Sequence, residues 1–203
     1  MGLSTYTELQ ASVGDFLNRS DLTVVIPDFI TLAEAEFNRS LRVREMSVRT
    51  RAPVETQYVK LPENYLALSN VELVTDTVTL LQYKDPQSLD SFRRTNKKGK
   101  PLYFSVLQNN LEFAPVPDSE YIVEIVYYQR IPALAQNVTN WLLQYHPDLY
   151  LMSTLAQSAP YLKEDERIAM WAGKALMIIE QIKKSDEQAR FSGSTLSPSF
   201  TPY

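Results

Sequence analysis

The sequence predicts an α+β protein: a helical bundle formed by the N- and C-terminal helices, with an inserted antiparallel β domain and an extended C-terminal tail. Near both ends of the chain, apolar residues recur at three- and four-residue steps, which is typical of helices that bury one face. From 44 to about 130 this spacing gives way to short alternating or β-branched runs bounded by Pro, Asn and Asp, which predict strands. The predicted parts are N-terminal helices at 1–43, a mainly β region with one short helix at 44–138, C-terminal helices at 139–190 and the tail at 191–203.

The N-terminal region predicts two amphipathic helices. Thr5 and Glu8 match the capping box that begins a helix, and this first helix should end near Asn18. Pro27 opens the second helix, where its missing N–H costs nothing. The apolar faces comprise Leu9, Val13, Phe16 and Leu17 in the first helix and Phe29, Leu32, Ala33, Phe37 and Leu41 in the second. Both faces need partners, and we expect the C-terminal helices to supply them.

The middle region predicts seven strands and one short helix. The strands are expected at 47–51, 56–60, 67–74, 78–84, 102–107, 110–114 and 121–130. The segment from Gln108 to Asn110 is predicted to form a hairpin loop, because Asn tolerates positive φ. Asp85 caps the predicted helix, Pro86 opens it, and Leu89 with Phe92 should face inward.

The C-terminal region carries the clearest helical signals. Thr139 or Asn140 can cap a short turn, Pro147 begins one helix, and Pro160 argues for its end. A longer helix follows, with Glu164 to Glu166 complementing the dipole at its N-terminus. Its apolar residues comprise a seam of Ile168, Trp171, Ala175, Ile178 and Ile182 and a second set of Leu176, Met177 and Ile179. We expect the seam to be buried against the N-terminal helices, and the second set indicates packing on two sides.

The composition limits the classes of function. With 203 residues, of which 44% are hydrophobic and 22% charged, the chain can bury a sizeable core. No apolar run approaches the length needed to span a bilayer, and no secretory signal is recognisable, so we expect a cytoplasmic protein without a membrane role. The absence of cysteine excludes disulfides and thiolate chemistry.

The sequence offers little for catalysis, and we predict no catalytic, cofactor-binding or metal-binding residues. The single histidine, His146, precedes Pro147 and is expected to lead into a helix, and none of the five glycines belongs to a nucleotide-binding pattern. Asp118 followed by Glu124 on a strand faintly resembles a metal nuclease, but Val126 stands where a lysine is wanted. A carboxylate-metal nuclease and a DNA- or regulator-binding module therefore remain the alternative functions.

Positive charge is concentrated in two segments of a chain whose net charge is −4. The segment 39–51 holds five arginines against Glu45, and the basic loop at 93–100 holds Arg93, Arg94, Lys97, Lys98 and Lys100. Because the rest of the chain is acidic, these segments suit pairing with copies of the chain or with an acidic partner. The alternative interpretation of the basic loop is a solvated surface.

The final segment, 191–203, is small and polar with two prolines, and here it is called the C-terminal arm. Its apolar side chains are widely spaced: Phe191, Leu196, Phe200 and Tyr203. Such a segment cannot build a core, so it is either simply disordered or an arm that orders when these side chains dock on a partner.

Several of these segments resemble the head-to-tail adaptor family of tailed double-stranded DNA bacteriophages, and the similarity extends over nearly the whole chain. They are 6–9 (YTEL), 26–30 (IPDFI), 61–66 (LPENYL), 140–143 (NWLL), 147–151 (PDLYL) and 159–167 (APYLKEDER). Each is a capping, turn or packing pattern, so the resemblance concerns a scaffold and not an active site.

The resemblance implies a structural role in the virion neck. It implies a dodecameric ring beneath the portal protein that continues the DNA channel and carries tail nozzle or tail fibre proteins. Genomic DNA would pass through this channel without sequence-specific binding. The C-terminal arm resembles the family's portal-docking arm, whereas the basic loop is expected, from its charge, to contact a neighbouring subunit or tail protein.

Overall fold

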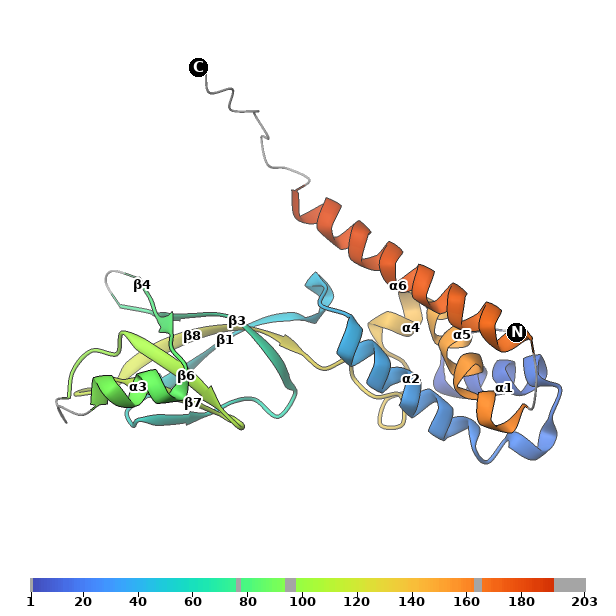
Figure 1. Ribbon diagram of the computed structural model, residues 1–203, viewed down its shortest axis with the longest axis horizontal. Coiled ribbons are helices and arrows are strands. Elements are labelled where there is room, and N and C mark those ends of the chain that lie inside the picture. Colours follow the sequence, from blue (N-terminus) through green and yellow to red (C-terminus); the bar gives the residue numbers. More distant parts are fainter. Residues whose placement is uncertain (1, 76–77, 94–97, 163–165, 192–203) are drawn as a thin grey trace, which may run out of the picture. The chain divides into compact units, whose positions relative to one another are not determined.

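The computed structural model describes residues 2–75, 78–93, 98–162 and 166–191, and it confirms the α+β class (Figure 1). Contacts divide the chain into two compact units. The helical unit comprises Met1–Glu45 and Ile131–Tyr203, and the β unit comprises Met46–Arg130. The second half of the helical unit therefore begins at 131, eight residues before the first C-terminal helix signal in the sequence.

Two helices of the helical unit, α1 and α4, begin at capping residues that the sequence indicates. In α1 (Tyr6–Leu17) the Thr5 hydroxyl accepts from the Glu8 backbone N–H and the Glu8 carboxylate accepts from Thr5 N–H. The remaining helices are α2 (Ile26–Ser40), α4 (Trp141–Tyr145), α5 (Pro147–Gln157) and α6 (Arg167–Phe191), with short 3-10 turns at Ser20–Leu22, Arg44–Met46 and Ala159–Tyr161. Asn140, not Thr139, caps α4 by accepting from Leu143 N–H at 2.8 Å.

Helix α5 is the centre of the helical unit, because α1, α2, α4 and α6 all pack on it. Its Tyr150 ring meets Phe37 of α2 edge-on with 5.0 Å between centroids. Trp171 and Ile178 of α6 are buried as expected, but the main partner of α6 is α5 and not the N-terminal helices (Figure 1). The prediction of that partner was wrong because α5 is apolar on several sides and shields α6 from α1 and α2.

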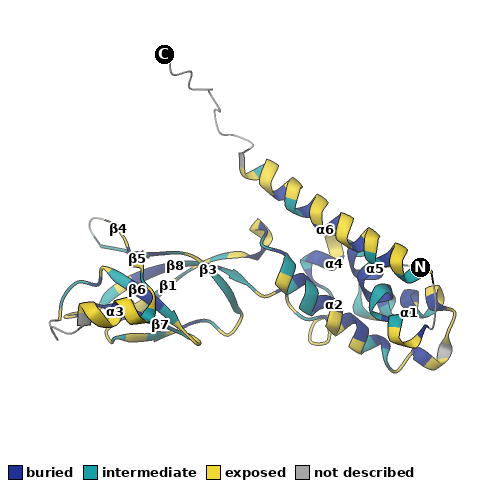
Figure 2. Ribbon diagram, viewed as in Figure 1, coloured by how far each residue is buried: buried dark blue, intermediate teal, exposed yellow. Residues whose placement is uncertain are grey.

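Several apolar residues assigned to buried faces are exposed instead. These are Phe16, Leu32, Leu176 and Met177, with exposed fractions between 49% and 59%. Figure 2 shows exposed positions along α1, α2 and α6. The second apolar set of α6 is therefore split: Ile179 is 2% exposed, whereas the other two members face solvent. Two-sided packing of α6 does not occur within the described part of the chain.

The β unit contains two four-stranded sheets that share one apolar core. The first has the order β1 (Ser47–Val54), β8 (Tyr121–Gln129), β3 (Tyr65–Leu73), β4 (Thr79–Leu80) and is antiparallel. The second has the order β2 (Tyr58–Lys60), β7 (Asn110–Ala114), β6 (Tyr103–Leu107), β5 (Gln82–Tyr83). Side chains from both sheets, including Val71, Phe104, Phe113 and Ile125, make up the core.

The β unit departs from the sequence predictions in three places. The predicted strand 78–84 is two short strands separated at the buried Leu81, and the second pairs parallel to β6. In the hairpin between β6 and β7 the positive φ belongs to Gln108, not to an asparagine. Helix α3 (Pro86–Arg93) is capped by Asp85 as predicted and buries Leu89, but Phe92 is 41% exposed and stacks on Tyr103.

Candidate interaction surfaces

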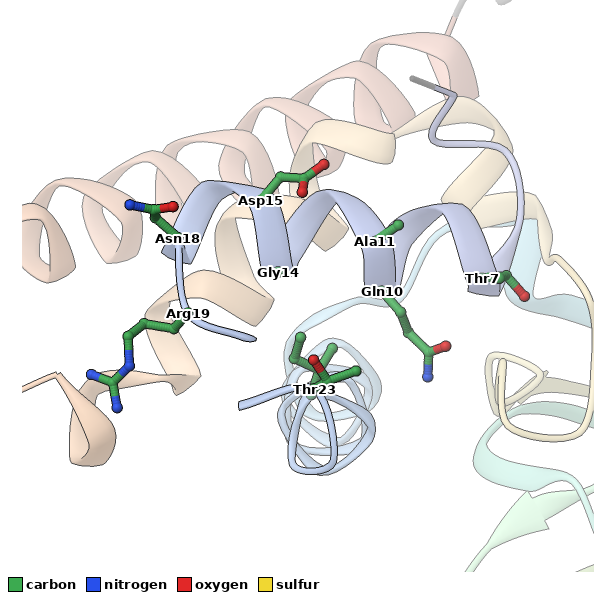
Figure 3. A pocket seen from close by; sticks show the side chains of 9 residues that line it. Thr7, Gln10, Ala11, Gly14, Asp15, Asn18, Arg19 and Thr23 are labelled. Atoms are coloured by element: carbon green, nitrogen blue, oxygen red, sulfur yellow. The ribbon is translucent and has the colours of Figure 1, made fainter. Parts of the chain in front are cut away.

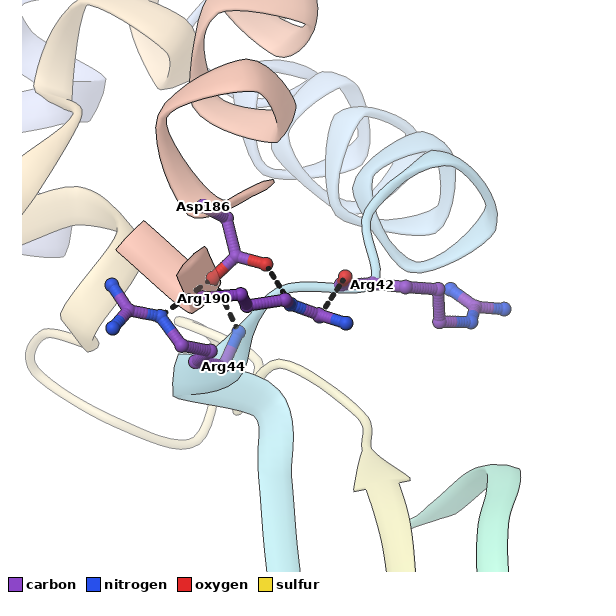
Figure 4. A network of polar contacts seen from close by, with 4 residues as sticks. All are labelled: Arg42, Arg44, Asp186 and Arg190. Carbon is purple, nitrogen blue, oxygen red and sulfur yellow. Dashed lines mark hydrogen bonds and ion pairs between the residues drawn. The ribbon is translucent and has the colours of Figure 1, made fainter. Parts of the chain in front are cut away.

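One buried carboxylate ties the end of α6 to the segment that follows α2 (Figure 4). Asp186 accepts from the backbone N–H of Arg44 at 3.0 Å, from its Nε at 2.9 Å and from Nε of Arg190 at 2.8 Å. Arg190 also donates to the carbonyl oxygen of Arg42. Burial alone would raise the pKa of Asp186, but the hydrogen bonds from Arg44 and Arg190 outweigh it and lower that pKa. The last turn of α6, from which the C-terminal arm continues, is thereby held in place.

The basic segment 39–51 is largely committed to contacts inside its own units. Besides Arg44, Arg42 donates to the carbonyl oxygen of Asn38 at 2.8 Å. In the β unit, Arg49 and Arg51 of β1 donate to the two carboxylate oxygens of Glu124 on β8, at 2.7 and 2.8 Å. The basic segment 39–51 therefore has fewer unpaired positive charges to offer a partner than its composition indicates.

The same contacts bear on the nuclease alternative. Hydrogen bonding from Arg51 and the charge of Arg49 lower the pKa of Glu124, and both of its oxygens are already occupied. Asp118 accepts a hydrogen bond from the Tyr121 hydroxyl at 2.7 Å. Among the described residues, no group of three His, Cys, Asp or Glu side chains is arranged to hold a metal ion.

The basic loop is only partly within the described residues. Arg94 and Lys97 lie outside them, and Arg93 is the last residue of α3. Lys98 is exposed, whereas the Lys100 ammonium donates to the hydroxyls of Thr79 at 2.8 Å and Thr75 at 3.3 Å. Lys100 thus has a local role beside β4, and Lys98 is the described member that can reach a partner.

An aromatic surface adjoins the basic loop. Phe92 stacks on Tyr103 with 4.4 Å between ring centroids, and the ammonium of Lys84 lies 5.5 Å from the centre of the Tyr103 ring. Tyr83, which is 59% exposed, contacts Phe104 edge-on. This surface was not predicted from the sequence, although the aromatic residues at 83, 92 and 103 alternate with lysines and offered a usable signal.

The C-terminal arm lies outside the described residues except for Phe191, the last residue of α6. Its predicted docking residues Leu196, Phe200 and Tyr203 therefore stay predictions. The acidic start predicted for the last helix also stays a prediction, because Glu164 and Asp165 lie outside the described residues and α6 begins at Arg167.

A second buried carboxylate, which the sequence analysis did not single out, sits on α2. Glu34 accepts from Leu134 N–H at 2.8 Å and from the Tyr150 hydroxyl at 3.2 Å. Asn140 in turn donates to the Tyr150 oxygen at 2.7 Å. Burial raises the pKa of Glu34, and these hydrogen bonds offset part of that effect. Its position between Ile30 and Phe37 on an apolar face was the available signal.

The helical unit also carries an open groove of about 630 Å³ along α1 (Figure 3). Gln10 and Thr23 line it, and Ala11 and Gly14 leave space along the helix. Elsewhere in this unit, α6 exposes Met170, Leu176 and Met177 on the side away from α5. Neither surface was predicted as a site. Of the helices that the structure describes, none is long and apolar enough to cross a membrane.

Comparison with known protein families gives a match over nearly the whole chain. A family model described as SU10 adaptor protein matches residues 4–198. The match begins before α1 and ends within the C-terminal arm, so it includes both units. A search of curated proteins finds no match.

Proposed function

The chain belongs to the SU10 adaptor family, and on this premise we propose that it is the ring-forming head-to-tail adaptor of a tailed bacteriophage. Copies of the chain assemble beneath the portal protein, continue the channel through which the genome leaves the head, and present a platform for tail nozzle or tail fibre proteins. The observation that carries this proposal is the family match over 195 residues, from 4 to 198.

The surfaces of the two units support a structural role. Exposed apolar residues on α6, the α1 groove and the aromatic surface beside the basic loop are features of a protein that binds other proteins. The basic loop contacts acidic surface on a neighbouring subunit or tail protein, and Lys98, which is exposed, is one of the residues that make this contact. DNA passes without sequence-specific contacts.

The C-terminal arm docks on the portal in this proposal. It continues from Phe191, whose helix is anchored through Asp186, so the arm starts from a defined point on the helical unit. Twelve residues beyond Phe191, when extended, reach roughly 40 Å. Several arms around one ring share the attachment, so individually weak contacts still hold the ring through effective concentration.

The decisive experiment measures binding to the portal protein of the same phage. The full chain and a chain ending at Phe191 are each weighed alone by native mass spectrometry and then sedimented with the portal. We expect the full chain to sediment with the portal as a ring, and the shortened chain to keep its melting temperature but lose portal binding. Full-strength binding by the shortened chain would refute the docking role of the arm.

The nuclease alternative has its own test. A structural adaptor leaves DNA intact in the presence of Mg²⁺ or Mn²⁺. Divalent-metal-dependent cleavage that disappears on replacement of Asp118 or Glu124 would instead assign a catalytic function. Salt-sensitive DNA affinity would point to the DNA-binding module.

A further inference from the structure

The outward side of α6 carries an apolar stripe over its first three turns. Here the α6 stripe denotes five exposed residues: Ala169, Met170, Gly173, Leu176 and Met177. Met170, Leu176 and Met177 are between 48% and 59% exposed. Further along the same side, the exposed residues are Glu180, Lys184 and Glu187. The change from apolar to charged along one helix face marks the stripe as a limited contact site.

The second surface is the α1 groove, which lies on a different part of the same unit. Helices α1 and α2 pack on α5 and on each other, while α6 packs mainly on α5. The stripe points away from α5, so the two surfaces do not face one another within one chain. Apart from the buried Ile26, the groove is lined by small, polar or charged residues, among them Asp15 and Arg19, and it is open.

Each surface contains a glycine inside a helix that its own chain does not explain. A Cβ built at Gly173 would meet no atom within 4 Å, and one built at Gly14 would meet only the Ile26 methyl group at 3.7 Å, an ordinary contact. Glycine in a helix interior costs about 1 kcal/mol relative to alanine. Close approach of another helix would account for glycine at both positions.

The elements that carry the two surfaces differ in the sign of their net charge, and Arg19, a basic residue that lines the groove, is paired with Asp21. Helix α6 holds five basic and three acidic residues, a net charge of +2, whereas the segment from Tyr6 to Ser40 holds six acidic and two basic residues, a net charge of −4. Asp15 at the groove and Lys174 beside the stripe are exposed, and neither has an ion-pair partner within the described part of the chain. Opposite potentials of this kind favour association of unlike surfaces over association of like ones.

We propose that the α6 stripe of one copy docks in the α1 groove of the next copy. Two different surfaces on one chain make a head-to-tail contact, which leaves a free stripe at one end and a free groove at the other, and such contacts close into a ring when the rotation between copies permits. Methionine side chains suit this contact because they adapt to an irregular groove. The inference rests on the proposed function, which requires a ring, and adds the surfaces that build it.

Cross-linking tests the pairing directly, because the chain has no cysteine of its own. Full-length Ala11→Cys and Met177→Cys variants are treated with a short bismaleimide, separately and mixed, alone at high concentration and bound to the portal. We expect covalent dimers only in the mixture, and a ladder of multimers from the double variant. Self-cross-linking of Met177→Cys would show an α6–α6 contact and overturn the proposal. Absence of the mixed product in both samples would also overturn it, whether or not the chain still sediments with the portal.

Substitutions give a second, independent readout. Met177→Glu should weaken association between copies by about tenfold or more, while Gln181→Glu, which adds the same charge one turn along on an exposed position, should not. Gly173→Ala should raise the melting temperature of the separate chain and yet weaken assembly, since it improves the helix and occupies the contact space. A stabilised Gly173→Ala variant that assembles normally would place the contact elsewhere.

Discussion

Asp186 and Arg44, 142 residues apart in the sequence, are joined by two hydrogen bonds, from the arginine backbone N–H at 3.0 Å and from its Nε at 2.9 Å. With Arg190 as a second donor, the carboxylate of Asp186 links the last turns of α6 to the point at which the chain leaves α2. This network holds the helix that presents both the α6 stripe and the start of the C-terminal arm. The contribution of this network to the free energy of unfolding can be measured.

Replacing Asp186 with asparagine should lower the free energy of unfolding by on the order of 2 kcal/mol. Hydrogen bonds to a charged group contribute more than neutral ones, and the amide keeps the shape while losing the charge. Denaturant titration measures the change. Glu187→Gln is the matched control, because Glu187 is an exposed neighbour on the same turn, and it should shift the free energy by less than about 0.5 kcal/mol.

The contribution of Asp186 should also depend on pH. Because the folded state lowers the pKa of Asp186, the stabilisation is present above the pKa of the unfolded state and is lost as the pH falls through the folded-state pKa. The difference in unfolding free energy between wild type and Asp186→Asn should therefore be constant near neutral pH and shrink below about pH 4. A difference that stays constant down to pH 2 would show that the charge of Asp186 contributes nothing.

Glu34 should respond to pH in the opposite direction. Burial raises its pKa, so its neutral form suits the folded state, and stability is lost as the pH rises through the folded-state pKa. Glu34→Gln keeps an acceptor for Leu134 and Tyr150 without the charge. We expect this variant to match wild type at pH 4 and to exceed it at pH 8, by thermal melts. Glu34→Ala, which leaves both donors unpaired, should be destabilised by about 1–3 kcal/mol at either pH.

Several helix caps and helix starts were predicted correctly from the sequence. The capping box at Thr5 and Glu8, the cap at Asp85 and the helix start at Pro147 all appear where the sequence places them, and Asn140 is the cap of the two residues that the sequence allowed. Each of these signals depends on contacts within a few residues. Side-chain periodicity also identified four buried residues of the α6 seam, which are Trp171, Ala175, Ile178 and Ile182.

Long-range choices were not predictable in the same way. Periodicity shows that α6 has a buried face, but whether α5 or the N-terminal helices cover it depends on tertiary packing. The exposure of Phe16, Leu32 and Leu176 has the same origin, since an apolar residue at the edge of a face is covered only when a neighbour reaches it. Glu34 and Asp186 were missed because their partners lie 100 to 142 residues away in the sequence.

Substitutions in the two apolar sets of α6 should have very different effects on the free energy of unfolding. Trp171→Ala removes a side chain that is 3% exposed and packs in the interface with α5, so it should cost about 3–5 kcal/mol. Leu176→Ala, on the exposed side of the same helix, should change the free energy of unfolding by less than about 0.5 kcal/mol. Thermal melts of the separate chain decide this. A wild-type melting temperature for Trp171→Ala would contradict the burial of that face.

The basic loop gives the last prediction, which concerns assembly and not stability. Arg93, Arg94, Lys97 and Lys98 are replaced with glutamine, while Lys100 is kept because its ammonium donates to Thr75 and Thr79 and its loss would disturb the β unit. We expect the variant to melt as wild type but to join the neck assembly more weakly, with the largest defect at low ionic strength. Salt screens exposed charges over about 10 Å at 0.1 M, so the difference from wild type should narrow as salt is raised.

The control compares two double variants. The first combines Lys97→Gln with Lys98→Gln, and the second combines Lys60→Gln with Arg130→Gln. Both remove two positive charges from the β unit, but the second pair lies outside the basic loop. Quantitative co-sedimentation with the portal and tail proteins measures the effect. Equal losses from the two double variants would assign the effect to net charge, and no loss from either the quadruple or the double variant would show that the loop is solvated surface.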